Sequence, residues 1–467
     1  MQVFNTLGRR LQPLETRDPG TVSMYVCGPT VQSAPHVGHG RQAVAFDVIR
    51  RYLRWRGFRV TYVTNITDVE DKIIKAAREE GIPTEEVARR ATAQFLEAYR
   101  RLGVLAPDRL VYATAHIPEM LEMIGRLIDG GHAYPAGGDV YFSVRSFPGY
   151  GKLSGRNVDE LVAGARIEPG EHKRDPADFA LWKGSKPGEP SWDSPWGPGR
   201  PGWHIECSAM AEKELGFGFD IHGGGLDLVF PHHENEIAQA EAASGSAPFC
   251  RVWLHNGMVN LRGDKMAKST GNVIGLLDLL DRYPPLAVRL FYLRAHYRAP
   301  IDFSDEAMED ARASLERLWA FRRRVEETGA APDAGALDRF RAAMDEDFNT
   351  AEALGVLFEL VRQGNRDLDA GEDAGPHAAA YDEIAGTLGL LEPEADLDDL
   401  AEGLAALSLR HGIEGTEPAA LLDGLVARRS RARAEREWAV ADAIRDGLAA
   451  LGVALEDGPD GTTWHRG

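Results

Sequence analysis

Two histidines and two glutamates fall within five consecutive positions of the stretch FPHHENEIAQ, residues 230–239. On a helix, His232 and Glu236 would project from one face because they are four residues apart, and His233 lies three residues from Glu236. Imidazole and carboxylate groups hold metal ions or move protons. One chemistry open to this cluster is zinc-dependent hydrolysis, with Glu234 as the general base.

A second candidate site is HVGHGR, residues 36–41. It follows an expected strand and precedes an expected helix, so backbone N–H groups and the helix dipole would face an anion there. His36 and His39 supply paired donors, and Gly38 lets a planar ring or a phosphate approach the backbone. The first β-to-α turn of an open α/β sheet is a common ligand-binding position.

A third candidate is the polar loop GDKMAKSTGNVI, residues 263–274. Its two lysines, Lys265 and Lys268, stand three residues apart among glycine, serine and threonine. Such a loop can fold over a triphosphate and neutralise charge on departing pyrophosphate. Taken alone, it is more typical of a solvent-exposed polar loop.

The elements needed to position these residues can be read from hydrophobic periodicity. Strands are predicted at 21–31 and 59–65, each followed by a helix, and Gly81 is predicted to end the second helix. Strand, helix, strand, helix favours a parallel sheet with crossover connections. Helical periodicity dominates after residue 305, where Leu315, Leu318, Phe321 and Val325 form one stripe.

Composition limits the function further. The chain has 467 residues, a formal net charge of −19 and three cysteines, which do not form a disulfide framework. No secretory signal or membrane span is evident, so a cytoplasmic protein is expected. Three arginine-rich stretches, 50–59, 311–324 and 428–436, are typical of solvated helix faces, but they leave room for a polyanion held along a defined track.

Together the early HxGH and the later KMxKS are the paired signature of class I aminoacyl-tRNA synthetases. Further blocks narrow the resemblance to the cysteinyl-tRNA synthetase family: CGPTVQSAPHVGHGR, NITDVEDKII, RPGWHIECSAM, DIHGGGLDLVFPHHENEIAQ, KMAKSTGN, DEDFNTAEAL and DGTTW. They run through essentially the whole chain. Ala267 departs from the serine usual in the lysine loop, and neither lysine is lost.

The resemblance implies a zinc ion held by Cys27, Cys207, His232 and Glu236, and it selects His232 over His233. Two thiolates, an imidazole and a carboxylate suit zinc. Cysteine must be distinguished from serine, and an apolar pocket separates such pairs by only ~10–200-fold. Zinc binds a thiolate far better than an alcohol, which would make editing unnecessary. Cys250 is expected to be a small buried hydrophobe.

The resemblance also implies the remaining roles. His36, His39, Lys265 and Lys268 would stabilise charge during adenylate formation, and Gly38, His39 and the two lysines would bind ATP, with Mg²⁺. Near the amino and carboxylate ends of the substrate, it implies Thr67, Trp203, His222 and Asp227.

The expected fold is α/β: a Rossmann-like parallel-sheet catalytic domain split by an insertion, then a helical bundle and a small C-terminal anticodon-binding domain. The expected divisions are 1–134 and 202–280 for the catalytic domain, 135–201 for an irregular insertion, 281–312 for a stem-contact region, 313–395 for the bundle and 400–467 for the anticodon-binding domain.

The function implied by the resemblance is ATP-dependent joining of L-cysteine to tRNA(Cys) by a monomer. In the last domain, the arginine-rich helix would contact phosphates, and Trp464 would either stack on a base or pack on its own helix. A mycothiol-biosynthesis cysteine ligase, which passes cysteine to an amino-sugar inositol, is the nearest alternative. The zinc hydrolase leaves HxGH and KMxKS without a role.

Overall fold

The computed structural model describes residues 1–159, 172–261, 264–265, 273–326, 329–393, 397–458 and 461–466. The chain divides into two compact units, Met1–Leu390 and Leu391–Gly467. None of the helices in these ranges is long and apolar enough to cross a membrane.

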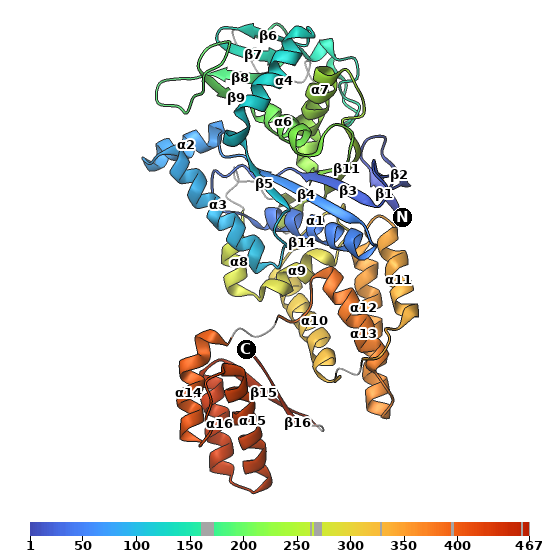
Figure 1. Ribbon diagram of the computed structural model, residues 1–467, viewed down its shortest axis with the longest axis vertical. Coiled ribbons are helices and arrows are strands. Elements are labelled where there is room, and N and C mark those ends of the chain that lie inside the picture. The colour runs from blue at the N-terminus through green and yellow to red at the C-terminus, as the bar shows by residue number, and fades with distance from the viewer. Residues whose placement is uncertain are drawn as a thin grey trace. The chain divides into compact units, whose positions relative to one another are not determined.

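A five-stranded parallel sheet forms the centre of the first unit, in the order β11-β10-β3-β4-β5 (Figure 1). Its strands are β3 (Thr21–Val26), β4 (Arg59–Ile66), β5 (Arg109–Tyr112), β10 (Phe219–Gly225) and β11 (Cys250–Asn256). Met24 of β3 pairs with Tyr62 of β4 on one side and with Ile221 of β10 on the other. The prediction of a parallel sheet is confirmed, and the strand order changes direction at β3.

The two faces of the sheet carry separate cores, because successive side chains of a strand point to opposite faces. Met24 and Val26 join the core that contains α1, whereas Tyr25 and Cys27 join the core that contains α6 and α7. Figure 1 shows these helices on opposite sides of the sheet. The helices next to the sheet are α1 (Val37–Trp55), α2 (Asp71–Glu80), α3 (Thr84–Arg101), α4 (Ile117–Asp129), α6 (Trp203–Leu215) and α7 (Glu234–Ser244).

The segment between α4 and α6 is more regular than its composition predicts. A four-stranded antiparallel sheet, order β6-β7-β8-β9, runs through it. Its strands are β6 (Ala133–Ala136), β7 (Asp139–Phe142), β8 (Phe179–Gly184) and β9 (Gly199–Pro201). Gly184 pairs with Gly199, so the Gly-, Pro- and Trp-rich stretch is the loop between two strands. The expectation of an irregular insertion is therefore wrong for the strands that flank this loop.

Helices make up most of the remainder of the first unit. They are α8 (Leu276–Arg282), α9 (Pro285–Leu293), α10 (Asp305–Arg323), α11 (Ala334–Asp345), α12 (Thr350–Ala370) and α13 (Gly375–Leu388). The stripe of Leu315, Leu318, Phe321 and Val325 is buried, as predicted. Five short strands complete the unit: β1 (Gln2–Asn5), β2 (Arg10–Pro13), β12 (Val259–Leu261), β13 (Asp264–Lys265) and β14 (Ile301–Phe303).

The second unit has a core of its own. Leucines of α14 (Ala401–Arg410) and α15 (Pro418–Ala434) pack with Ile444 and Leu448 of α16 (Trp438–Ala450). An antiparallel pair, β15 (Val453–Gly458) and β16 (Gly461–Arg466), ends the chain.

A buried ionic network ties α1 to α9 in the first unit. The Asp47 carboxylate accepts hydrogen bonds from the guanidinium groups of Arg289 at 2.6 Å, Arg50 at 3.0 Å and Arg51 at 2.7 Å. It also accepts a hydrogen bond from the Leu105 N–H at 2.9 Å. The Asp47 and Arg289 side chains are both 0% exposed. Burial alone would raise the pKa of Asp47, but the arginines outweigh it and lower the pKa to about 2.

Asp47→Asn is expected to destabilise the first unit by about 3–5 kcal/mol, because it leaves Arg289 as a buried charge without its counterion. Chemical denaturation at neutral pH measures this loss. Because the folded pKa of Asp47 lies below the ordinary value of 3.8, its stabilising effect is present above about pH 4 and is lost as pH falls toward 2. Glu97→Gln, which removes an exposed pair with Arg100, is the control and should cost under about 1 kcal/mol.

Candidate active site

A pocket of about 230 Å³ opens at the carboxyl edge of the parallel sheet. Cys27, Thr67, Gly225 and Asn256, which end or follow β3, β4, β10 and β11, all line it. The pocket thus lies where the strand order changes direction, the usual binding position in open α/β sheets. Nine of the residues proposed from the sequence line it: Cys27, His36, Gly38, His39, Thr67, Trp203, Cys207, Asp227 and His232.

The HxGH turn forms the N-terminal cap of α1. Gly38 N–H donates to His36 Nδ1 at 3.1 Å, and His36 N–H donates to His39 Nδ1 at 3.1 Å. The two rings lie close, with centroids 3.7 Å apart. A Cβ on Gly38 would stand 3.0 Å from the His36 ring, so glycine here makes room for that ring.

These backbone bonds fix the chemistry of both rings. A neutral imidazole has one N–H, and a ring that accepts a hydrogen bond at Nδ1 must carry its proton on Nε2. His36 and His39 are therefore neutral donors through Nε2, on the first turn of a helix. That arrangement is suited to oxygen atoms that gain negative charge during a reaction.

On the opposite side of the sheet lie four potential metal donors. The Sγ atom of Cys27 is 3.5 Å from Cys207 Sγ, 3.6 Å from His232 Nε2 and 3.4 Å from Glu236 Oε1. All four donor atoms lie within 4.8 Å of one another, and all four residues are buried. The cluster unites Cys27, which follows β3, Cys207 of α6, His232 of the π-helical turn η4 (Val229–His233) and Glu236 of α7.

Two further histidines orient the donors of this cluster. His204 Nδ1 lies 2.9 Å from His232 Nδ1, which leaves His232 Nε2 directed at the other donors. His222 Nε2 lies 2.8 Å from Glu236 Oε2, which leaves Oε1 for the cluster. Such partners are typical of residues that bind metal. His222 is 0% exposed and is stacked on Trp253, behind Glu236, and it does not line the pocket.

The electrostatics of the cluster also fit a cation. Burial raises the pKa of the Cys27 thiol well above its usual value, and Cys207 and Glu236 raise it further. A hydrogen bond from Cys27 lowers the pKa of Cys207 to about 6. Burial alone would raise the pKa of Glu236, but His222 and His232 hold it well below its usual range. A thiolate and a carboxylate thus share a buried space with a second sulfur, and a cation there would stabilise all three.

A second set of possible metal donors comprises Cys27, His222, His233 and Glu236. Two of its members are already engaged: His222 contacts Glu236, and His233 Nδ1 lies 2.8 Å from His255 Nε2. His233 does not line the pocket, whereas His232 does. Access to the pocket therefore favours the set with His232.

Glu234 is held by the backbone rather than by the site. It accepts N–H groups of Gly151 at 2.9 Å and Ser154 at 2.8 Å, and it is 1% exposed. Hydrolytic chemistry with Glu234 as base is therefore disfavoured.

The other proposed substrate contacts differ in their surroundings. Thr67 Oγ1 donates to Glu206 at 2.8 Å and accepts from Asn65 at 3.2 Å. Trp203 stacks on His232, with centroids 4.5 Å apart. Asp227 is exposed, in the short turn η3 (Leu226–Leu228).

Several residues of the site had no signal in the sequence pattern. Gln42 Nε2 donates to the Cys27 carbonyl at 2.6 Å, Lys72 Nζ lies 5.7 Å from the centroid of the Trp203 ring, and Tyr99 lines the pocket. Glu206 is fully buried behind Thr67, and burial raises its pKa well above the usual value. Lys72 lies inside the quoted block NITDVEDKII, which is the one hint available.

The lysine loop is described only in part. Lys265 belongs to β13, where its backbone pairs with Asn260. Lys268 and Ala267 lie outside the described residues.

Three family models match the chain in succession. The tRNA synthetases class I (C) catalytic domain matches residues 13–313, the DALR domain matches 339–392, and the Cysteinyl-tRNA ligase anticodon binding domain matches 419–464. The first of these covers more than half of the chain.

Curated relatives match over their full length. The Cysteine--tRNA ligase of Pseudomonas aeruginosa is 51% identical over 472 residues, covering 100% of this chain and 99% of the relative. That of Alkalilimnicola ehrlichii is 51% identical over 472 residues, covering 100% of both. Among solved structures, Mycobacterium tuberculosis methionyl-tRNA synthetase in complex with methionyl-adenylate has a TM-score of 0.57 at 17% identity, covering 87% of this chain and 94% of that one, which shows a shared fold.

Proposed function

This chain belongs to the cysteine–tRNA ligase family of class I synthetases, and from that premise we propose how its pocket performs the reaction. The enzyme activates L-cysteine with ATP to cysteinyl-adenylate, releasing pyrophosphate, and transfers the cysteine to the 3′-terminal adenosine of tRNA(Cys). The mycothiol-type ligase is not favoured, because relatives named Cysteine--tRNA ligase align end to end and residues 419–464 match a tRNA-ligase domain.

One observation carries the assignment of the site: three members of the four-donor cluster, Cys27, Cys207 and His232, line the same pocket of about 230 Å³ as the HxGH turn. We assign Cys27, Cys207, His232 and Glu236 as the ligands of a zinc ion. When bound, zinc supplies a soft Lewis acid that favours a thiolate over an alcohol, and so selects cysteine over serine. His204 and His222 hold His232 and Glu236 in the orientation that this requires.

The phosphate chemistry belongs to the opposite wall of the pocket. His36 and His39 donate their Nε2–H groups to phosphate oxygens of ATP, which gain charge as the cysteine carboxylate attacks. Gly38 keeps the first turn of α1 free of side-chain bulk. Lys265 and Lys268 neutralise charge on the departing pyrophosphate, and Mg²⁺ would add positive charge there when bound.

The ends of the amino acid are held between these walls. Thr67 uses a lone pair on Oγ1 to accept a hydrogen bond from the substrate ammonium, and Asp227 supplies a countercharge at the mouth. Trp203 covers the substrate from the side of His232. His222 contributes through Glu236 rather than by touching the substrate.

The enzyme acts as a cytoplasmic monomer.

Residues 391–467 are proposed to read the anticodon, and truncation after Leu390 tests this without cutting into the first unit. Cysteine-dependent ATP–pyrophosphate exchange should stay within a few-fold of the parental rate. The apparent KM for tRNA should rise by about 10–100-fold, because base stacking is worth ~1–3 kcal/mol per base. Exchange and tRNA charging are measured on the same preparations.

Normal charging by the truncated, folded protein would show that the second unit is not the reader. Loss of exchange as well would mean that the catalytic unit depends on residues 391–467, which contradicts the proposed division of labour.

A further inference from the structure

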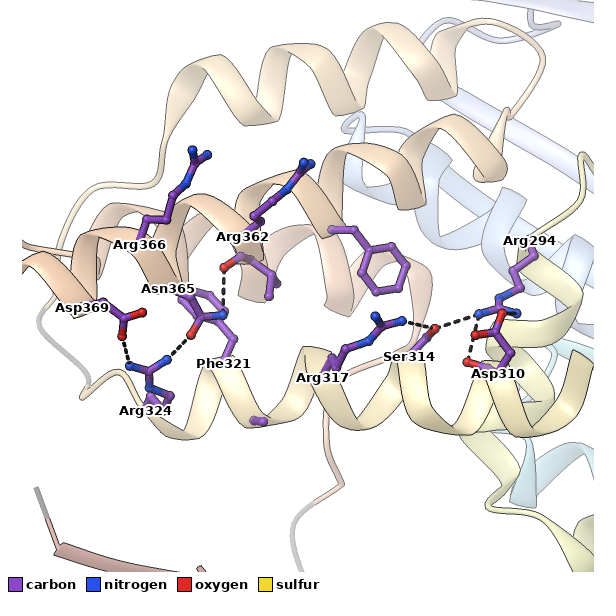
Figure 2. A pocket seen from close by; sticks show the side chains of 13 residues that line it. Arg294, Asp310, Ser314, Arg317, Phe321, Arg324, Arg362, Asn365, Arg366 and Asp369 are labelled. Atoms are coloured by element: carbon purple, nitrogen blue, oxygen red, sulfur yellow. Dashed lines mark hydrogen bonds and ion pairs between the residues drawn. The ribbon is translucent and has the colours of Figure 1, made fainter. Parts of the chain in front are cut away.

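A groove of about 860 Å³ lies between α10 and α12, away from the catalytic pocket (Figure 2). Phe321, Phe358 and Val361 supply its apolar surface. Charged side chains from both helices surround this surface, and Figure 2 shows Arg317 and Arg324 on one helix and Arg362 and Arg366 on the other.

The groove is basic on an acidic protein. Five arginines line it, Arg294, Arg317, Arg324, Arg362 and Arg366, against two aspartates, Asp310 and Asp369. Its net charge is thus positive by three, while that of the whole chain is −19. Local concentration of positive charge of this kind attracts a polyanion.

Only two of the five arginines meet an acid within the described part of the chain. Arg294 pairs with Asp310 at 2.7 Å, and Arg324 pairs with Asp369 at 2.7 Å. The other three are exposed and make neutral contacts at most: Arg317 bonds Ser314 Oγ, and Arg366 bonds Gln363 Oε1. Three unneutralised guanidinium groups along one groove repel each other, so an anionic occupant would stabilise them.

The spacing of the arginines fits a chain of phosphates better than a single anion. Arg317 of α10 and Arg324, the C-cap of that helix, are seven residues apart, a separation of about 10 Å along the axis. Arg362 and Arg366 are about 6 Å apart on α12. Phosphates of one nucleic-acid strand recur about every 3.4 Å along a duplex axis. Several phosphates therefore fit along the groove, and the planar guanidinium group binds phosphate oxygens in pairs.

We propose that this groove binds the sugar–phosphate backbone of the tRNA substrate and positions it without reading sequence. The inference rests on the proposed function, which requires a tRNA to bind. The proposed binding surface includes arginines of the basic stretch 311–324, which was found in the sequence. It also includes Arg362 and Arg366 of α12, which the composition of the sequence did not single out.

The test replaces two exposed arginines that make no ion pair among the described residues. Arg362→Gln with Arg366→Gln removes exposed arginines that have no acidic partner among the described residues. The matched control, Arg312→Gln with Arg341→Gln, removes the same charge from α10 and α11, where these exposed arginines pair with Glu309 at 2.9 Å and Asp338 at 2.8 Å. Binding of a tRNA(Cys) transcript is measured by fluorescence anisotropy between about 50 and 200 mM salt, a range over which phosphate contacts weaken strongly.

The groove variant should raise the Kd for the transcript by about 10–30-fold at ~0.15 M salt and lower the slope of log Kd against log salt by about 1.4–1.8, as expected for two lost phosphate contacts. The control should leave both quantities within about twofold, and cysteine-dependent ATP–pyrophosphate exchange should be unchanged in all three proteins. Backbone phosphates protected from iodine cleavage of a phosphorothioate transcript by the parental enzyme should lose protection in the groove variant.

A groove variant with parental Kd and salt slope would overturn the proposal and leave the groove to a partner other than RNA. An equal loss in the control would also overturn it, because general charge rather than this groove would then bind the tRNA. Failure of the parental enzyme to exchange pyrophosphate with cysteine would instead contradict the proposed function, so the two failures are distinguishable.

Discussion

Replacing Cys207 with serine is expected to abolish stoichiometric zinc and to slow cysteine-dependent ATP–pyrophosphate exchange by about 10³-fold or more, equivalent to roughly 4 kcal/mol of transition-state binding. The physical reason is the donor set. Cys207 Sγ lies 3.5 Å from Cys27 Sγ, and its pKa of about 6 makes it the readiest thiolate of the cluster. Serine is nearly isosteric but does not ionise at neutral pH, so the soft, anionic donor is lost.

Cys250→Ser is the matched control. Cys250 is also buried, but its thiol donates to the Val252 carbonyl at 3.3 Å, and it is not a member of either donor set. Metal analysis should find one zinc per chain in this control and in the parental enzyme, and its exchange rate should be close to parental. A Cys207→Ser protein with a full zinc complement and normal exchange would refute the ligand assignment.

Substitutions at His39 should separate its role as a cap from its role as a donor. The ring accepts the His36 N–H at Nδ1 and presents Nε2–H. Asparagine keeps an acceptor near the Nδ1 position and removes the Nε2 donor, whereas glutamine carries an amide N–H near the Nε2 position. His39→Asn should therefore slow adenylate formation by about 10²–10³-fold, the effect of losing one transition-state donor, and His39→Gln should lose much less.

Rapid-quench measurement of cysteinyl-adenylate checks this order of rates. Zinc content and thermal stability should stay parental in His39→Asn, since the metal cluster lies on the other side of the sheet. An asparagine variant that forms adenylate faster than the glutamine variant would show that capping, not donation, is what the enzyme needs from His39.

The sequence was sufficient for the sheet and for the position of HxGH, because both depend on local signals. Side chains alternate between the two faces of the sheet along β3, which places Met24 and Val26 in one core and Tyr25 and Cys27 in the other. The helix that follows β3 begins at Val37, within the HxGH motif. The end of α2 at Gly81, which has a φ of 70°, was also predictable from a glycine that follows a helical pattern.

The expectation that His232 and Glu236 share one helical face is confirmed: His232 lies in the π-helical turn η4 (Val229–His233), which leads directly into α7 at Glu234. The two side chains meet at 3.0 Å. Prediction failed where distant segments decide the local structure. The contact that orients His232 comes from His204 of α6, 28 residues away, and no local sequence pattern predicts it.

The arginine-rich stretch 428–436 shows a second limit of composition. Arg429 is largely buried and pairs with Asp457 at 2.7 Å, and Arg433 pairs with the same aspartate. Trp464 Nε1 donates to Asp423 of α15 at 3.3 Å, in favour of the interpretation in which it packs on its own unit. Part of this positive charge therefore stabilises the unit itself. Composition could not show this, because each acidic partner is distant in sequence.

The separation of the metal donors along the chain sets an order of events during synthesis. Cys27 leaves the ribosome 209 residues before Glu236, and the donors of α6 and α7 complete the cluster only when those helices dock on the sheet. The first thiol must therefore stay reduced and metal-free through nearly half of translation. On the proposed ligand assignment, zinc can be bound only after residue 236 has been made and α7 has docked, and a cell short of zinc would accumulate enzyme whose sheet is formed but whose four donors hold no ion.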